Sequence, residues 1–408
     1  MFNSRSVRLG LMMFLNYVIW GAWYVTISTY LTRKPSPGFS GIEAGAVFGT
    51  TALASMISPF FVGLIADRFF ATERVMAVLY LIGAVLLFSV TLTTSFGAVY
   101  GLMLAYCICY FPTIALTNTL VFKNVSDAGR QFPAIRLCGT LGWIAVGWII
   151  TKLNFQDQPG QFYVAAAASL VMAVYSLTLP HTPPAGRGEP ITVRNVLGLD
   201  ALVMLKRPTY LVFIIASILA CIPLTFYFSF GNKYLNDVHV PDAAGIMTLG
   251  QVSEVVAMLL MPLIFKRLSV RAILLMGLFA WSLRYGLLAY GNAGAGMWMF
   301  YVAILLHGIC YDFFFMTGQL YADQEAPSNL RVTAQGFLTF VTYGIGMFIG
   351  SNLSGVAVDY FTSNGSTDWR GFWLTSSAGA GIILLLVAAF FRSKGRIESG
   401  PEKRSAEA

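Results

Sequence analysis

Long apolar runs alternate with short polar breaks along the whole of this chain. About 20 helical residues cross the hydrocarbon core of a bilayer, and the runs have about that length. They predict twelve membrane-spanning helices, at approximately residues 9–31, 43–66, 74–93, 96–121, 132–151, 161–180, 209–232, 243–265, 270–290, 296–321, 332–358 and 370–392. A transmembrane β-barrel would show short segments of alternating polarity instead. The pattern therefore predicts an all-α membrane protein with 12 transmembrane helices.

The longest polar break follows the sixth run and divides the chain into two halves. Two six-helix bundles joined by a loop are the parallel-repeat plan of the major facilitator superfamily fold. The predicted organisation is an N-terminal bundle at 1–180, a central cytoplasmic loop at 181–208, a C-terminal bundle at 209–394 and a cytoplasmic tail at 395–408. Within the loop, ITVRNVLGLDALVMLK fits either an amphipathic helix on the membrane surface or an irregular linker.

The distribution of charge predicts the orientation. With 57% hydrophobic and 11% charged residues, the chain differs from any soluble globular domain. If both termini are cytoplasmic, 19 of the 26 Lys and Arg residues lie in cytoplasmic segments, 5 lie on the opposite side and 2 lie within spans. This bias follows the positive-inside rule. We therefore expect a multi-pass membrane protein with both termini in the cytoplasm, and the net charge of +8 reflects topology rather than a nucleic-acid partner.

Several classes of function lack their sequence signals. The five cysteines fall inside apolar segments, where they predict packing rather than disulfides, and the first run is too long for a signal peptide. The three histidines are widely separated and have no Cys at ligand spacing, so no metal site is expected. Neither a nucleotide-binding loop nor a nucleophile and base pair is apparent. The chain is therefore predicted to be no enzyme, to need no cofactor, and to draw its energy from an ion gradient.

Four Lys, Arg, Asp or Glu residues lie deep within the predicted spans, away from their ends: Arg136, Glu254, Arg284 and Asp312. A charge at the bilayer centre costs roughly 2.5 to 3.5 kcal/mol on insertion scales, and such residues usually mark substrate or proton pathways. Glu254 shares a helix face with Gln251, three residues earlier. It is a candidate for loading and releasing a proton, and the alternative is a hydrogen bond to a neighbouring helix.

Spans five and ten each place polar and aromatic groups on one face. Arg136, Thr140 and Trp143 stand at i, i+4 and i+7, an arrangement that could hold a ligand with a polar edge and a flat face. The alternative makes Arg136 an interfacial anchor and Trp143 a packing residue.

In span ten, His307 and Tyr311 share a face at i, i+4, and Asp312 points about one hundred degrees away. This geometry predicts that Asp312 forms a structural ion pair with Arg284 of span nine. Proton carriage by Asp312 and a purely structural role for His307 remain open.

The connection between spans two and three reads GLIADRFFATER, from Gly63 to Arg74. Its spacing resembles the G-x-x-x-D-R gating motif of the major facilitator superfamily, which implies that Gly63, Asp67 and Arg68 take part in a gate on the cytoplasmic side. The alternative is a solvated turn. The equivalent connection between spans eight and nine, IFKRLSVR, lacks the Asp.

Nine segments carry a more specific resemblance: IWGAWY, YFPTIALTNT, FPAIRLCGTLGW, LGLDAL, FGNKYL, GQVSEV, WSLRYGLLAYG, HGICYDFFF and TAQG. Together they resemble the bacterial nucleoside:proton symporter family, most closely a subgroup of nucleoside permeases apart from its best-studied members. The resemblance implies a substrate pocket between the halves. It implies these ligand residues: Arg136, Thr140, Trp143, Thr225, Phe228, Gln251, Glu254, His307 and Tyr311. Thr225 and Phe228 replace a Gln and an Asn of the studied members, which leaves the substrate range open.

The resulting prediction is proton-coupled uptake of nucleosides by alternating access, with the proton carried by Glu254 or Asp312. We expect a monomer in the lipid bilayer that binds one class of small molecule. The main alternative is a proton symporter of the same fold for a sugar, a glycoside or another small polar solute. A non-transporting membrane sensor is a second alternative, and the short tail offers it no signalling domain.

Overall fold

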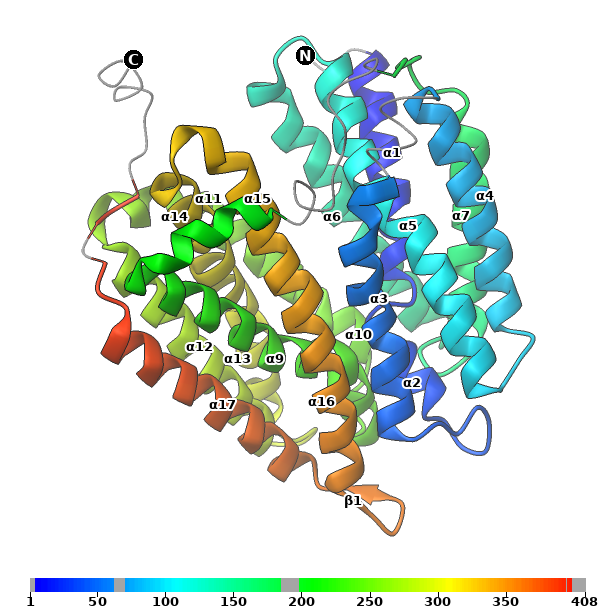
Figure 1. The fold of residues 1–408 in the computed structure, drawn as a ribbon. Helices are drawn as coiled ribbons and strands as arrows, with labels where there is room; N and C mark the ends of the chain where they lie inside the picture. Colours follow the sequence, from blue (N-terminus) through cyan, green and yellow to red (C-terminus); the bar gives the residue numbers. More distant parts are fainter. Residues whose placement is uncertain (1–3, 62–69, 185–197, 394, 398–408) are drawn as a thin grey trace. The chain divides into compact units, whose positions relative to one another are not determined.

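The computed structural model describes residues 4–61, 70–184, 198–393 and 395–397, and these residues are almost entirely helical (Figure 1). The elements of the first half are α1 (Ser4–Gly21), α2 (Ile27–Leu31), α3 (Gly41–Phe61), α4 (Thr72–Val90), α5 (Phe96–Asn124), α6 (Ala128–Lys152) and α7 (Gly160–Ser176). The first predicted span is therefore broken between α1 and α2.

The second half contains helices of three kinds. Its α-helices are α9 (Pro208–Asp237), α10 (Ala243–Met247), α11 (Leu249–Arg267), α12 (Val270–Tyr290), α13 (Met297–Tyr311), α14 (Thr317–Glu325), α15 (Arg331–Thr339), α16 (Met347–Tyr360) and α17 (Trp369–Phe390). Two 3-10 helices, η2 (Leu199–Lys206) and η4 (Ser328–Leu330), and two π-helices, η3 (Asp312–Met316) and η5 (Phe340–Gly346), lie among them. A two-residue antiparallel pairing of β1 (Thr362–Ser363) with β2 (Ser366–Thr367) forms the only sheet in the described part of the chain.

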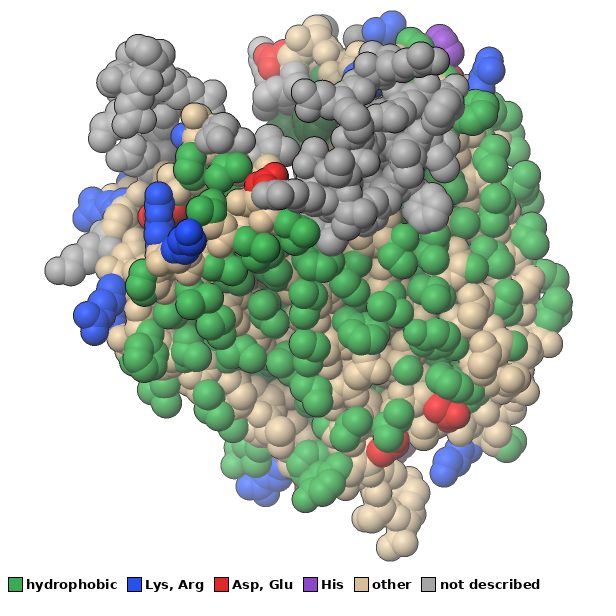
Figure 2. Space-filling model, viewed as in Figure 1, with side chains coloured by type: hydrophobic (Ala, Val, Ile, Leu, Met, Phe, Trp, Pro, Cys, Tyr) green, Lys and Arg blue, Asp and Glu red, His purple; other side chains and the backbone are tan. Residues whose placement is uncertain are grey.

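Nine helical stretches in the described residues are long and apolar enough to cross a membrane. Two shorter apolar helices, Gly41–Ile57 and Gly160–Ser176, accompany them. Many of their large hydrophobic side chains face outward, for example Leu259 at 74% exposure and Leu385 at 68%. Figure 2 shows wide areas of such side chains with few charged ones among them. The all-α, multi-pass architecture agrees with the sequence, while the count of twelve spans stays a prediction.

The described helices pack as two compact units. Unit 1 comprises α1–α7, the second part of α9 from Leu224, α10, and the chain from Tyr343 through α16 to Thr367. Unit 2 comprises η2, the first part of α9 to Pro223, α11–α15 and α17. Both α9 and the segment leading into α16 thus contribute to each unit. The domain boundaries predicted at the central loop stay a prediction.

Close approach of α1 and α6 organises the core of unit 1. A Cβ on Gly142 would collide with the backbone carbonyl of Phe14, and a Cβ on Gly10 would lie 3.1 Å from the Cys138 sulfur. Glycine at these positions lets the two backbones approach, as small residues do between membrane helices. The α1–α6 contact places the predicted ligand helix of span five directly against the first helix.

Aromatic packing and a glycine turn organise unit 2. The rings of Tyr285 and Trp373 stack with centroids 5.7 Å apart, and the Tyr285 hydroxyl donates to the Pro223 carbonyl at 2.6 Å. Gly198, which precedes η2, has a φ of 66° and packs so tightly against Thr333 that a side chain would collide. Of the amphipathic helix predicted in the loop, only this 3-10 helix lies in the described residues.

Candidate functional site

Arg136 of α6 is held by an aromatic ring from α1. Its guanidinium carbon lies 4.3 Å from the centroid of the Tyr17 ring, within the range of a cation–π interaction. Gly139, one helical turn later, leaves the necessary space: a Cβ there would lie 2.6 Å from Tyr17 Cδ2 and 3.1 Å from Arg136 Nη1. The missing side chain of Gly139 therefore allows Tyr17 to fix the direction of Arg136. Sequence reasoning missed Tyr17, although Gly139 at i+3 from a membrane arginine was a usable signal.

The predicted aromatic residues of unit 1 come together around Tyr24. The Tyr24 ring centroid lies 5.7 Å from Trp143 of α6 and 5.6 Å from Phe228 of α9. Trp20 adds an edge contact to Trp143 at 5.3 Å and 84°. Edge-to-face contacts of this kind hold rings in defined orientations. Trp20 and Tyr24 stand in the quoted segment IWGAWY, but sequence reasoning did not select them as site residues.

The remaining predicted residues of unit 1 differ in exposure. Thr140 is half-buried on α6, as are Trp143 and Phe228. Thr225, one turn before Phe228 on α9, has 0% of its surface exposed. In this conformation, Thr140, Trp143 and Phe228 have exposed surface that a ligand can contact, and Thr225 has none.

In unit 2, Arg284 of α12 is fully buried and contacts His307 of α13. The Arg284 Nη1 atom lies 2.9 Å from His307 Nδ1. A guanidinium can only donate hydrogen bonds, so Nδ1 of His307 accepts and the ring proton lies on Nε2. His307 is therefore neutral in this arrangement. The predicted ion pair of Arg284 with Asp312 stays a prediction, and the contact described here for Arg284 is with His307.

Asp312 and Glu254 form a pair of carboxyl groups in the same unit. Asp312 is only 2% exposed, and its Oδ2 atom has no hydrogen-bond partner among the described residues. The carboxyl of Glu254, half-buried on α11, is close enough to interact with it electrostatically. Asp312 also begins the π-helix η3, a helix type found frequently at functional sites. The structure thus places the two carboxyls that the sequence selected independently on contacting elements, α11 and η3.

Small residues explain why the face of α11 lies against α13. The backbone N–H of Gly308 donates to Ser253 Oγ at 3.0 Å, and a side chain on Gly308 would collide with the backbone at Ser253. A Cβ on Gly250 would lie 3.4 Å from His307. The segments GQVSEV and HGICYD therefore pack directly on each other, with Gln251 half-buried beside them.

Tyr311 completes this cluster on the same helix as His307. The two ring centroids are 5.7 Å apart, as the i, i+4 spacing predicts, and Tyr311 is half-buried. The predicted gating residues Gly63, Asp67 and Arg68 lie outside the described residues.

A family model and the relatives above 30% identity indicate one family. The family model described as nucleoside H+ symporter matches residues 3–396. YegT of Escherichia coli (strain K12), named as a transporter of nucleosides, is 39% identical over 95% of this chain and 94% of its own. The xanthosine permease of the same strain is 34% identical over 95% of both chains. The crystal structure of the nucleoside transporter NupG superposes with a TM-score of 0.90 at 29% identity, covering 96% of this chain and 100% of that one.

Proposed function

We propose that this chain, which belongs to the nucleoside:proton symporter family, takes up nucleosides across the bacterial inner membrane by alternating access. Both termini face the cytoplasm in this proposal, and the protein works as a monomer. The observation that carries the proposal is the family match over residues 3–396. An inward proton gradient supplies the energy, and the protein itself needs no cofactor.

Family membership confirms several predictions from the sequence. The resemblance to nucleoside symporters and the major facilitator fold are confirmed. The family consists of transporters, so the prediction that the chain is no enzyme is also confirmed. The chain is a multi-pass membrane protein with a small-molecule substrate.

For the substrate, we assign two groups of residues with different tasks. In unit 1, Arg136 and Thr140 supply hydrogen bonds to the base or ribose, and Trp143 and Phe228 supply flat surfaces for stacking, with Thr225 behind them. Support comes from the Tyr17 contact that fixes Arg136 and from the ring contacts through Tyr24. A preorganised group loses little conformational freedom on binding, which favours affinity. In unit 2, the assigned residues are Gln251, Glu254, His307 and Tyr311.

For the proton, we assign Glu254 as carrier with Asp312 as its partner. Two neighbouring carboxyl groups repel each other when both are ionised, and burial makes that repulsion stronger. A proton on one of them removes the repulsion and restores a donor for hydrogen bonding. Loss of the proton toward the cytoplasm would weaken the hold on substrate and release both.

Uptake into proteoliposomes tests the proposal. Labelled xanthosine, uridine and adenosine should accumulate when the outside is more acidic than the inside, and accumulation should stop when an ionophore collapses the gradient. A thermal-shift panel of nucleosides, nucleobases, sugars and glycosides should show stabilisation by nucleosides. Stabilisation by a sugar or glycoside alone would overturn the substrate assignment, and unchanged accumulation with the ionophore would overturn the proton coupling.

Replacing Tyr17 by Ala should weaken substrate binding through Arg136. A cation–π contact contributes about 0.5 to 2 kcal/mol, so we expect the apparent KM for nucleoside to rise roughly two- to thirtyfold. The maximal rate should change little, because a contact made equally in the ground and transition states affects KM alone. Initial uptake rates over a range of substrate concentrations measure both quantities.

Tyr17→Phe is the matched control, because it keeps the ring and removes only the hydroxyl. Its KM should stay close to the parental value. Equal KM values for Tyr17→Ala and the parent would contradict the positioning role. An equal rise in KM for Tyr17→Ala and Tyr17→Phe would show that loss of the ring is not the cause.

A further inference from the structure

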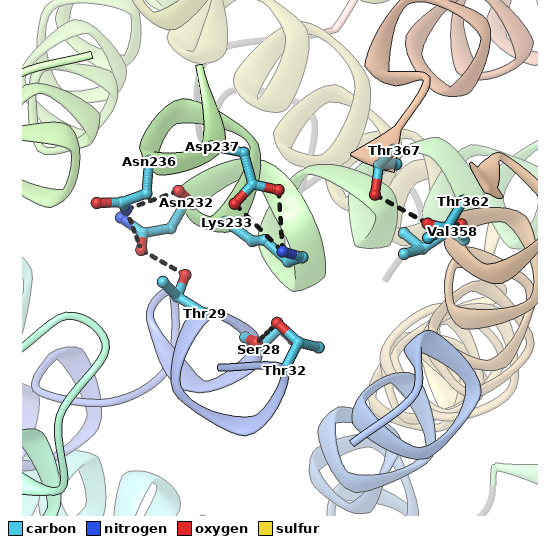
Figure 3. A network of polar contacts seen from close by, with 10 residues as sticks. All are labelled: Ser28, Thr29, Thr32, Asn232, Lys233, Asn236, Asp237, Val358, Thr362 and Thr367. Atoms are coloured by element: carbon cyan, nitrogen blue, oxygen red, sulfur yellow. Dashed lines mark hydrogen bonds and ion pairs between the residues drawn. The ribbon is translucent and has the colours of Figure 1, made fainter. Parts of the chain in front are cut away.

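A network of amides and hydroxyls joins α2 to the second part of α9 within unit 1 (Figure 3). Thr29 Oγ1 donates to Asn232 Oδ1 at 2.7 Å, and Asn236 Nδ2 donates to the same oxygen at 3.1 Å. Asn232 has 0% of its surface exposed. Buried amides of this kind are costly unless their hydrogen bonds are made, so the network specifies how α9 lies against α2.

Gln156 stands at the centre of this network. It belongs to the turn between α6 and α7, and its Oε1 atom accepts hydrogen bonds from three donors of the second half of the chain. These are Asn232 Nδ2 at 2.9 Å, Asn236 Nδ2 at 3.3 Å and the backbone N–H of Ala244 in the first turn of α10 at 3.0 Å. One side chain thus ties both α9 and α10 to the turn between α6 and α7.

The turn that carries Gln156 is itself anchored. Gln161 is fully buried, and its Nε2 atom donates to the carbonyl oxygens of Gln156 and Gln158, both at 3.2 Å. Its Oε1 atom accepts from Thr26 Oγ1 at 2.7 Å. Because the backbone of the turn is held by the α1–α2 region, the Gln156 side chain is presented to α9 from a fixed position.

A second attachment holds α16 against α3. The carboxylate of Asp359 accepts from the backbone N–H groups of Gly41 at 2.6 Å and Ile42 at 2.9 Å, at the N-terminus of α3. A carboxylate is favoured there by the helix dipole. A Cβ on Gly45 would lie 2.5 Å from the Ser351 carbonyl, so only glycine permits this approach of the two helices.

Both attached segments join the rest of their helices at irregular points. The boundary between the units follows Pro223 in α9 and follows Thr342 within the π-helix η5. Proline removes one hydrogen bond of a helix, and prolines and π-segments are places where helices bend. The segments 224–248 and 343–367 are thus attached to other helices of unit 1, and each connects to unit 2 on its N-terminal side through a point of this kind.

We infer that Gln156 is a gating residue, and that its hydrogen bonds form a latch which must open once in every transport cycle. The inference rests on the proposed alternating access. The latch lies where α2 ends, which is the end of the first span opposite the N-terminus. Because the proposal places the N-terminus in the cytoplasm, the latch lies on the outer side of the membrane. Hydrogen bonds to a neutral amide are individually weak in water, so thermal motion can break the latch, while together they favour the closed form.

Accessibility of a cysteine placed behind the latch tests this role. Ser28 of α2 is fully buried and neighbours Thr29, so Ser28→Cys is a nearly isosteric reporter. A membrane-impermeant maleimide added outside should label it slowly in the parent and roughly tenfold faster with Gln156→Ala, which loses three hydrogen bonds. The protein with its five native cysteines alone supplies the background.

Gln158→Ala is the matched control, because it lies in the same turn and its side chain makes no hydrogen bond among the described residues. Its labelling rate should equal that of the parent. Thr29→Val is a second variant that keeps the shape and removes one donor, and it should label roughly threefold faster.

Equal labelling of the latch variants and the Gln158→Ala control would overturn the gating role. If Gln156→Ala fails to fold, the rate of Thr29→Val decides the question alone. The measurement needs no substrate, so faster labelling together with absent nucleoside uptake would support the latch and overturn only the assigned substrate.

Discussion

Glu254→Gln is expected to abolish proton-driven accumulation of nucleoside while leaving exchange of nucleoside across the membrane intact. The amide keeps the shape of the carboxyl group and can still hydrogen-bond substrate, but it cannot take up or release a proton. One proton moving down a gradient of one pH unit supports roughly tenfold accumulation, because one unit corresponds to about 1.4 kcal/mol. The accumulation ratio of the variant should therefore fall to about one.

Both quantities can be measured on one preparation of proteoliposomes. Accumulation of labelled nucleoside is measured with an imposed proton gradient, and exchange is measured as nucleoside counterflow without a gradient. Asp237→Asn is the control, since Asp237 forms an exposed i, i+4 pair with Lys233 (Figure 3), and such pairs contribute little. Undiminished accumulation by Glu254→Gln would remove Glu254 as the carrier. If Asp312→Asn then abolished accumulation, the proton would be assigned to Asp312 instead.

Hydropathy predicted the helices of this protein well because a bilayer leaves the backbone few alternatives. Every N–H and C=O in hydrocarbon must be satisfied internally, so each long apolar run forms a helix, as α4, α5 and α17 do. The interruptions were not predictable in this way. The break after Gly21 and the π-helix from Asp312 to Met316 lie inside apolar sequence. Hydropathy depends on the side chains alone, so it does not reveal a change in the backbone hydrogen-bond pattern.

Candidate site residues were found where a rare chemical group stands in an apolar run, as with Arg136 and Glu254. Residues that position them were missed, because Tyr17 and Tyr24 are ordinary aromatic residues of a membrane helix. Their role depends on contacts with helices distant in sequence, namely α6 and α9. Gln156 was missed for the opposite reason, since it is one polar residue among several in a polar break. Its importance arises only when α9 and α10 are brought to that turn.

The contact between Arg284 and His307 was not selected from the sequence either, and it leads to the second prediction. Arg284 contacts His307, and removing either side chain should destabilise the protein. We expect His307→Leu to lower the free energy of unfolding by about 1.5 to 3 kcal/mol, since it removes an acceptor from a buried charge. Arg284→Met should cost a comparable amount, because it leaves the His307 Nδ1 acceptor without this donor. Thermal melts in detergent without substrate measure both.

The double variant distinguishes this contact from two unrelated packing effects. Replacing both partners of a buried polar contact by apolar groups is often less costly than removing one, so the double variant should lose at least about 1 kcal/mol less than the sum of the single losses. Ser282→Ala combined with His307→Leu is the control, because Ser282 lies on α12 like Arg284 but bonds to Ser377 of α17. The losses in unfolding free energy of Ser282→Ala and His307→Leu should be additive. Additivity of Arg284→Met with His307→Leu would show that the contact between the two side chains contributes nothing to stability. The role of Arg284 would then depend on another partner in the same buried cluster.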